Sequence, residues 1–216
     1  MLKLKDPFSG LSHLAGALLS IVGLSVLVYQ SILQGSMSHI VAFSIFGASL
    51  VLLYTSSALY HLLILSDKKM LKLRRIDHMM IFVLIAGTYT PVCLIPLKGP
   101  WGYSFLVGIW LLAASGILIK KFWMNAPRWL STLLYVTMGW LVIIAFWPLI
   151  QTVSLNGIFW LALGGVLYTI GAIIYATKWP PNYIPGWMGF HEIFHVFIMA
   201  GSFCHFWLMA KYIMYL

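Results

Sequence analysis

The chain has 216 residues, of which 62% are apolar and only 8% are charged. Because soluble domains carry roughly 25% charged residues, this composition excludes a soluble globular protein and makes the lipid bilayer the solvent for most of the chain. The formal charge of +9 comes from basic residues between apolar runs, so we expect them to meet anionic lipid headgroups and expect no nucleic acid as a partner.

Seven apolar runs are long enough to cross a bilayer, since a spanning helix needs about 20 apolar residues. They are too long and too uniformly apolar to be the strands of a transmembrane barrel. In chain order, the predicted spans are 12–34, 39–65, 76–97, 101–120, 129–149, 156–177 and 188–212. The sequence therefore predicts an all-α integral membrane protein with a single seven-helix domain over residues 1–216. Pro91 is expected to kink the third span.

The basic residues predict the orientation of the bundle. Eleven of the 13 lysines and arginines lie in the N-terminal tail and the connections after spans two, four and six, and only Lys98 and Lys211 lie at the other end. The positive-inside rule then places the N-terminus in the cytoplasm and the C-terminus outside. This orientation is the reverse of that of the G-protein-coupled receptors. The last span also lacks a central lysine on which retinal could form a Schiff base.

A pair of histidines at the start of the last span predicts a metal site. His191 and His195 are four residues apart, which places both imidazoles on one face of a helix about one turn apart. Two imidazoles so placed are able to grip one metal ion. A hydrogen-bonded pair within the bundle is the alternative interpretation.

Three further polar residues are expected at the same depth. Ser57 and His61 lie near the cytoplasmic end of the second span, and Asp77 begins the third span at that end. Three histidines with an open fourth position are typical of catalytic rather than structural zinc. In this interpretation His61, His191 and His195 bind zinc, Asp77 accepts a proton from a zinc-activated water, and Ser57 holds the water or the substrate.

Each of these residues also has a purely structural interpretation. Asp77 would cap the third helix or pair with Arg74 or Arg75, and Ser57 would bond to its own helix backbone.

The remaining polar residues are expected outside the metal site. His78 meets another neighbour, His13 supports the site or an interface, His39 is interfacial, His205 lies in the core or a cavity, and Glu192 pairs with a loop cation or faces the interface. Cys93 and Cys204 read as buried core residues without a disulfide.

The chain resembles the hemolysin III family, the bacterial branch of the progestin and adipoQ receptor family. The resemblance rests on SHLAGALLS at 12–20, SSALYH at 56–61, RRIDHMMIFVLIAGTYTP at 74–91 and HEIFHVFIMAGSFCH at 191–205. These segments occur in the family order and extend over almost the whole chain. Where family members often carry Glu, Asn, Thr and His before the first span, this chain has Asp6, Ser9, Ser12 and His13.

The resemblance implies seven helices in the bacterial plasma membrane, with the N-terminus inside. It also implies a zinc ion held by the equivalents of His61, His191 and His195, with Asp77 and Ser57 beside its water. The related adiponectin receptors and alkaline ceramidases are regarded as zinc-dependent lipid amidases, so ceramide-like amides are the analogous substrates.

Three functions are therefore compared. The preferred hypothesis is a membrane-embedded zinc hydrolase that cleaves a lipid amide or ester, with Asp77 as general base. A cytolytic, pore-forming protein is the second, although the spans carry few polar residues away from the histidines. The third is a receptor or a sensor of membrane lipid homeostasis in which zinc is structural.

Overall fold

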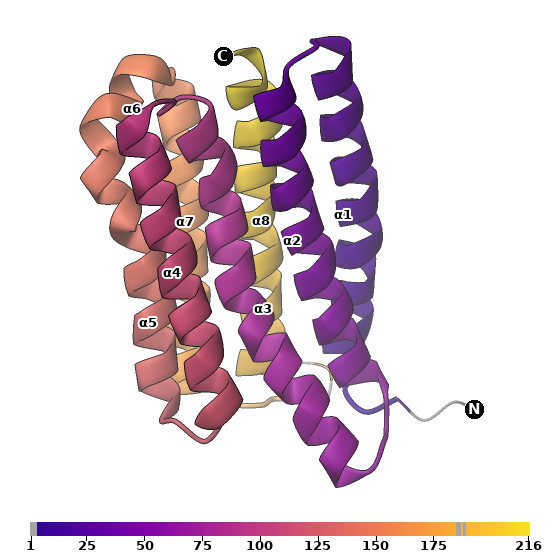
Figure 1. Ribbon diagram of the computed structural model, residues 1–216. Coiled ribbons are helices and arrows are strands. Elements are labelled where there is room, and N and C mark those ends of the chain that lie inside the picture. Colours follow the sequence, from indigo (N-terminus) through magenta and orange to yellow (C-terminus); the bar gives the residue numbers. More distant parts are fainter. Residues whose placement is uncertain (1–3, 185–186, 188) are drawn as a thin grey trace.

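A computed structural model describes residues 4–184, 187 and 189–216 of the chain. These residues form a bundle of helices that run up and down, and the first described residues lie at the opposite end from the C-terminus (Figure 1). The helices are α1 (Pro7–Leu33), α2 (Met37–Leu62), α3 (Asp67–Leu94), α4 (Pro100–Phe122), α5 (Arg128–Trp140), η1 (Leu141–Ala145), α6 (Phe146–Thr152), α7 (Leu155–Thr177), α8 (Phe190–Lys211) and η2 (Ile213–Tyr215).

The prediction of seven membrane-spanning segments is confirmed within the described residues. Six spans are single α-helices with or without a short 3-10 end, and the fifth, Arg128–Thr152, combines α5, η1 and α6. The first described residues, the connections after α2 and α4 and the described part of the connection after α7 lie at one end of the bundle (Figure 1). Residue 188, the first of the predicted seventh span, lies outside the described residues.

The third helix begins nine residues before the predicted start. The basic segment from Lys68 to Arg75, expected as a loop, forms the first turns of α3. Asp67 lies in the first turn, where a carboxylate interacts favourably with the helix dipole. Asp77 is therefore ten residues inside the helix, and its interpretation as an N-cap is wrong.

The fifth span is interrupted by a stretch of 3-10 helix. Pro148 lies in α6, just after the five residues of η1. A proline ring has no N–H to donate and clashes with the carbonyl four residues earlier, which is that of Ile144 within η1. The proline therefore explains why a continuous α-helix, as predicted over 129–149, does not form.

The first helix shows how polar residues are accommodated. Its large apolar side chains such as Leu18, Leu19 and Val22 are exposed. The face buried in the bundle carries mostly small or polar residues, namely Ser9, Gly10, His13, Gly16, Ala17, Ser20, Gly23, Leu27 and Ser31. In lipid, apolar burial does not drive helices together, so small residues that permit close approach occupy the interfaces. Because the polar face of α1 is the one that packs in the bundle, its histidine, His13, is buried there.

Helices α2, α3 and α8 form the centre of the bundle. In the most apolar part of each span, half of the residues of α2 and α3 and 39% of those of α8 are buried. The corresponding share is 17% in the fifth span and in α7. Cys93 and Cys204 are buried and unpaired, as predicted. The central helices are also those that carry His61, Asp77, His191 and His195.

We predict that Gly87→Ala destabilises the protein, whereas Gly108→Ala does not. A Cβ at Gly87 would overlap the side chain of Ser49 on α2, while a Cβ at Gly108 on α4 meets nothing within 4 Å. Overpacking costs about 1–3 kcal/mol, and alanine otherwise favours a helix. Thermal unfolding of the purified protein in detergent measures the difference, and equal melting temperatures for the two variants would contradict the close packing of α2 on α3.

Candidate metal centre and its cavity

Three histidines meet at the end of the bundle where the basic residues gather. His61 lies in the last turn of α2, and His191 and His195 lie in the first two turns of α8. One ring nitrogen from each lies within 4.8 Å of the others. His61 and His195 are each only 2% exposed. The antiparallel course of α2 and α8 thus joins residues that are 130 positions apart, as the sequence predicted.

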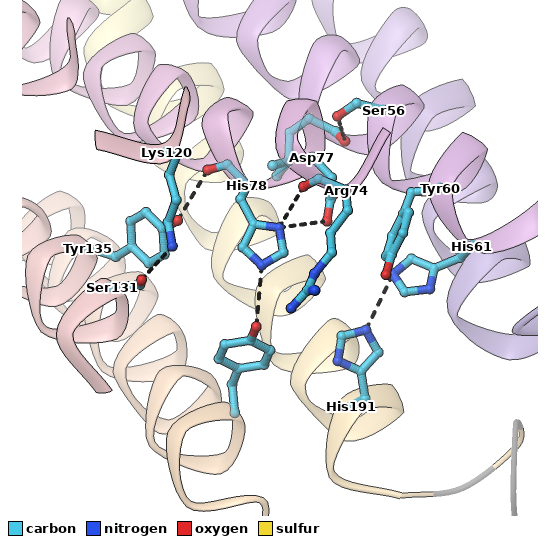
Figure 2. A network of polar contacts seen from close by, with 12 residues as sticks. Ser56, Tyr60, His61, Arg74, Asp77, His78, Lys120, Ser131, Tyr135 and His191 are labelled. Carbon is cyan, nitrogen blue, oxygen red and sulfur yellow. Dashed lines mark hydrogen bonds and ion pairs between the residues drawn. The ribbon is translucent and has the colours of Figure 1, made fainter. Parts of the chain in front are cut away.

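The spacing of the ring nitrogens fits a metal ion. The Nε2 atoms of His61 and His191 face each other at 3.3 Å (Figure 2). Two nitrogen ligands bound at about 2.0–2.1 Å to tetrahedral zinc lie roughly 3.3 Å apart. A hydrogen bond between the two rings would account for this pair alone. It would not account for the third imidazole in the same small space.

The third histidine has a nitrogen without a partner. The Nδ1 atom of His195 is buried and forms no hydrogen bond with the described residues. The ring of His13 stacks on that of His195, with 3.7 Å between centroids. His13 therefore supports the cluster, as predicted. Buried polar atoms are rarely left unsatisfied, and the cluster thus has donor atoms available for a ligand.

An aspartate before the first helix orients His61. An oxygen of the Asp6 carboxylate lies 3.0 Å from the Nδ1 atom of His61. The hydrogen bond from His61 holds the pKa of Asp6 below its ordinary value, partial burial opposes this effect, and the ammonium of Lys5 adds to it. The ionised carboxylate therefore accepts the Nδ1 proton and leaves the Nε2 lone pair of His61 free. Metal-binding histidines commonly have such a carboxylate partner.

Asp77 and Ser57 lie beside the histidines rather than among them. Both line the same cavity as His61, and Ser57 is a neighbour of the Asp77 carboxyl. Asp77 is outside the group of converging donor atoms. It lies 3.7 Å from the Nδ1 atom of His78, and among the described residues it forms no ion pair with an arginine. The arginine-pair interpretation of Asp77 is therefore wrong.

The predictions for the outlying residues had mixed outcomes. His78 contacts the hydroxyl of Tyr175 at 3.4 Å but also the carboxylate of Asp77, so the prediction that it meets a different neighbour holds only in part. His205 lines the cavity, as expected. Glu192 is buried and accepts a hydrogen bond from Ser9, so its predicted interfacial position is wrong. His39 is buried in the first turn of α2, and the Ser36 hydroxyl lies 2.6 Å from its Nδ1 atom; its position at the membrane interface stays a prediction.

The histidines open into a cavity of about 680 Å³. Its residues on α7 recur every three or four positions between Ile158 and Tyr175, so the cavity follows one face of that helix. A rise of about 1.5 Å per residue makes this distance roughly 25 Å. Away from the histidines the lining is mainly apolar, with Leu84, Val92, Val142, Leu149 and Leu161. One end of the cavity is thus polar and the rest suits a hydrocarbon chain.

The sequence did not single out several polar residues at the polar end. Arg128 and Tyr175 line the cavity, and Lys120 is buried beside Ser131. Their individual positions give no periodic or motif signal. Only the packing of α4 and α5 against α3, and of α7 against α5 and α8, brings them to this end of the bundle.

Comparison with known proteins identifies the family of the chain. The family model described as Haemolysin-III related matches residues 1–206. The chain is 43% identical over 204 residues to the hemolysin-3 homolog of Bacillus subtilis, covering 94% of this chain and 92% of that protein. It is 40% identical over 208 residues to hemolysin-3 of Bacillus cereus, covering 95% and 90%.

The chain is also similar, at lower identity, to a eukaryotic protein. The chain is 27% identical over 192 residues to the progestin and adipoQ receptor-like protein 1 of Caenorhabditis elegans, covering 77% of this chain and 42% of that protein. Seven spans within the described residues and a family match over almost the full length agree with each other. The chain therefore belongs to the hemolysin III family and is a multi-pass bacterial membrane protein.

Proposed function

We propose that the protein is a zinc-dependent hydrolase that cleaves an amide or ester bond of a membrane lipid. The observation that carries this proposal is the convergence of His61, His191 and His195 at the polar end of a long apolar cavity. Three histidines with an open position are the donor set of catalytic zinc. The apolar length of the cavity along α7 suits the chain of a lipid.

The three histidines would hold zinc through the ring nitrogens that face one another. When bound, zinc would supply a Lewis acid that polarises a carbonyl and makes a water more acidic. Asp6 keeps His61 in the required tautomer by accepting its Nδ1 proton. Asp77, which lines the same cavity, would accept the proton of the attacking water and pass it to the leaving group. Ser57, beside Asp77, would orient that carboxylate or the substrate.

The apolar cavity supports binding of the lipid within the bundle. A substrate chain would lie along α7, with its carbonyl group near the histidines. The lining residues come from several helices of the bundle, and their mainly apolar side chains would contact the hydrocarbon chain of the lipid. Ceramide-like amides are the analogous substrates, so they head the compounds to be tested.

Two other functions can be distinguished from the hydrolase by experiment, a pore and a receptor or sensor. The name of the relative hemolysin-3 suggests a pore-forming activity as an alternative function. The mainly apolar lining of the cavity favours a lipid chain over a water-filled path. Dye release from liposomes that persists in a His191→Ala variant would support a pore. A loss of thermal stability on chelation, with no turnover of any lipid, would support a receptor or sensor with structural zinc.

We expect the purified wild-type protein to contain about one zinc ion per chain, and His191→Ala to contain none. Removing one of three ligands leaves too few donors for tight binding. Elemental mass spectrometry of the detergent-purified protein measures this. His39→Ala is the control, because His39 lies at the far end of α2 and contacts Ser36. Folded wild-type protein without metal, even after zinc loading, would rule out the zinc site.

Asp6→Asn is expected to weaken zinc binding by about 10–100-fold, the usual effect of losing a carboxylate that supports a ligand. The neutral amide no longer holds the Nδ1 proton of His61 as strongly. Competition with a chelator of known affinity gives the dissociation constant. Asp67→Asn is the matched control, since Asp67 lies in the first turn of α3. Equal affinities for the two variants would show that Asp6 does not support the site.

Asp77→Asn is expected to lower the rate of lipid hydrolysis by about 100-fold or more, the contribution of a general base. Its zinc content should stay unchanged, because Asp77 lies outside the group of donor atoms. Release of fatty acid from a panel of ceramides, other lipid amides and esters measures the rate. If the zinc-loaded wild type releases no fatty acid from any of them, the hydrolase proposal fails.

A further inference from the structure

A second group of polar side chains lies inside the bundle, away from the histidine cluster. The hydroxyl of Tyr54 on α2 donates a hydrogen bond to the hydroxyl of Ser202 on α8 over 2.7 Å, and the hydroxyl of Tyr168 on α7 lies 2.8 Å from the same oxygen. The ring of His205 packs edge-on against that of Tyr168, with 5.3 Å between the centroids. His205 lies ten residues beyond His195 in α8, which is roughly 15 Å along the helix.

Two members of this group belong to the wall of the cavity. Tyr168 lies on the face of α7 that follows the cavity, and His205 lines the cavity from α8. Gly164 lets the His205 ring approach α7 closely, because a Cβ at this glycine would overlap the ring at Nε2 and Cδ2. The neighbouring wall is apolar, with Leu161 and Ile198. The mainly apolar part of the cavity thus contains a polar position that the proposed hydrolysis does not use.

The imidazole of His205 has a hydrogen-bond acceptor to spare. Its Nε2 atom lies 3.3 Å from the carbonyl oxygen of Leu161. Because a carbonyl oxygen only accepts, the proton of the neutral ring lies on Nε2 and the lone pair on Nδ1. The Nδ1 atom is buried and forms no hydrogen bond with the described residues. The residue is only 7% exposed, and buried polar atoms of this kind are normally paired.

The hydroxyl of Tyr168 has a hydrogen to donate. Because Tyr54 donates to Ser202, the hydrogen of Ser202 is free to go to the oxygen of Tyr168. In that arrangement the phenolic hydrogen of Tyr168 has no acceptor in the described part of the chain. A donor on one side chain and an acceptor on its neighbour together suit one hydroxyl group, which accepts one hydrogen bond and donates another.

We propose that Tyr168 and His205 form a subsite for a hydroxyl group on the chain of the lipid in the cavity. This hydroxyl accepts a hydrogen bond from Tyr168 and donates one to the Nδ1 atom of His205. An extended chain advances roughly 1.2 Å per bond, so a distance of roughly 15 Å along α8 corresponds to about 12 bonds from the head group. The ligand class is therefore a long-chain lipid that carries a hydroxyl near the middle of its chain.

The subsite would make the cavity selective. A position built to bond a hydroxyl discriminates against the analogue that lacks it, because the buried donor and acceptor then stay unpaired. That a lipid with such a hydroxyl is the substrate rests on the proposed function. Its binding depends neither on turnover nor on the metal.

The test is equilibrium binding to the purified full chain in nonionic detergent. The probes are octadecan-1-ol, octadecane-1,12-diol and octadecane-1,2-diol, which are uncharged, equal in length and free of any amide or ester bond. They compete with tritiated octadecan-1-ol. We expect the 1,12-diol to bind about tenfold more tightly than either of the others. A 1,12-diol that binds within about twofold of octadecan-1-ol, or no better than the 1,2-diol, would overturn the proposal.

Variants then locate the preference. His205→Phe keeps a ring but removes the acceptor, and Tyr168→Phe removes only the hydroxyl, so each should lower the preference by about threefold or more. His205→Asn keeps an acceptor close to the Nδ1 position and should retain most of it, which a role in packing alone would not allow. Tyr89→Phe is the matched control, because Tyr89 also lines the cavity but its hydroxyl already bonds to the carbonyls of Met138 and Gly139.

The controls separate the subsite from a general change in the cavity. Equal losses in Tyr168→Phe and Tyr89→Phe would overturn the subsite. Thermal unfolding and an unchanged affinity for octadecan-1-ol show that a variant is folded, and Tyr168→Phe decides the question where His205→Phe fails to fold. A chain that prefers the 1,12-diol but cleaves no lipid loses only the hydrolase proposal. A chain that cleaves lipids without this preference loses only the subsite.

Discussion

Inside a bilayer, a polar side chain has no water to bond with, and this constraint accounts for the position of nearly every polar residue in the bundle. On α1 the serines bond to carbonyls one turn earlier, as Ser20 and Ser31 do. Larger polar groups cannot be satisfied within their own helix. They must meet partners from other helices, so the bundle collects five of its seven histidines and its carboxylates at one end and leaves the lipid-facing surface mainly apolar.

The candidate metal centre follows from this constraint. The donor atoms of His61, His191 and His195 converge, while a second set of contacts from Asp6 and His13 fixes two of the rings. A bound cation would satisfy nitrogens that the protein leaves open. The same logic applies farther along the cavity, where Tyr168 and His205 offer a donor and an acceptor that a ligand hydroxyl would pair.

The cavity links the centre to the membrane. The interruption of the fifth span at η1 lies beside the apolar part of the cavity, since Val142 and Ile143 line it. A regular helix in this position would present side chains at a different spacing. The proline that causes the interruption therefore also shapes the space in which we place a lipid chain. The position of Pro148 in α6 therefore influences the shape of the cavity beside the histidines.

The sequence by itself determined the class of protein, the seven spans and the histidines that converge, because apolar length and the four-residue spacing of His191 and His195 are local properties. The charge asymmetry also predicts the orientation. Only the tertiary structure decided that Asp6 supports His61, that Asp77 lies ten residues inside α3, and that Arg74 and Arg128 share a cavity. These facts depend on where helices begin and how they pack, and no local pattern of residues encodes such contacts.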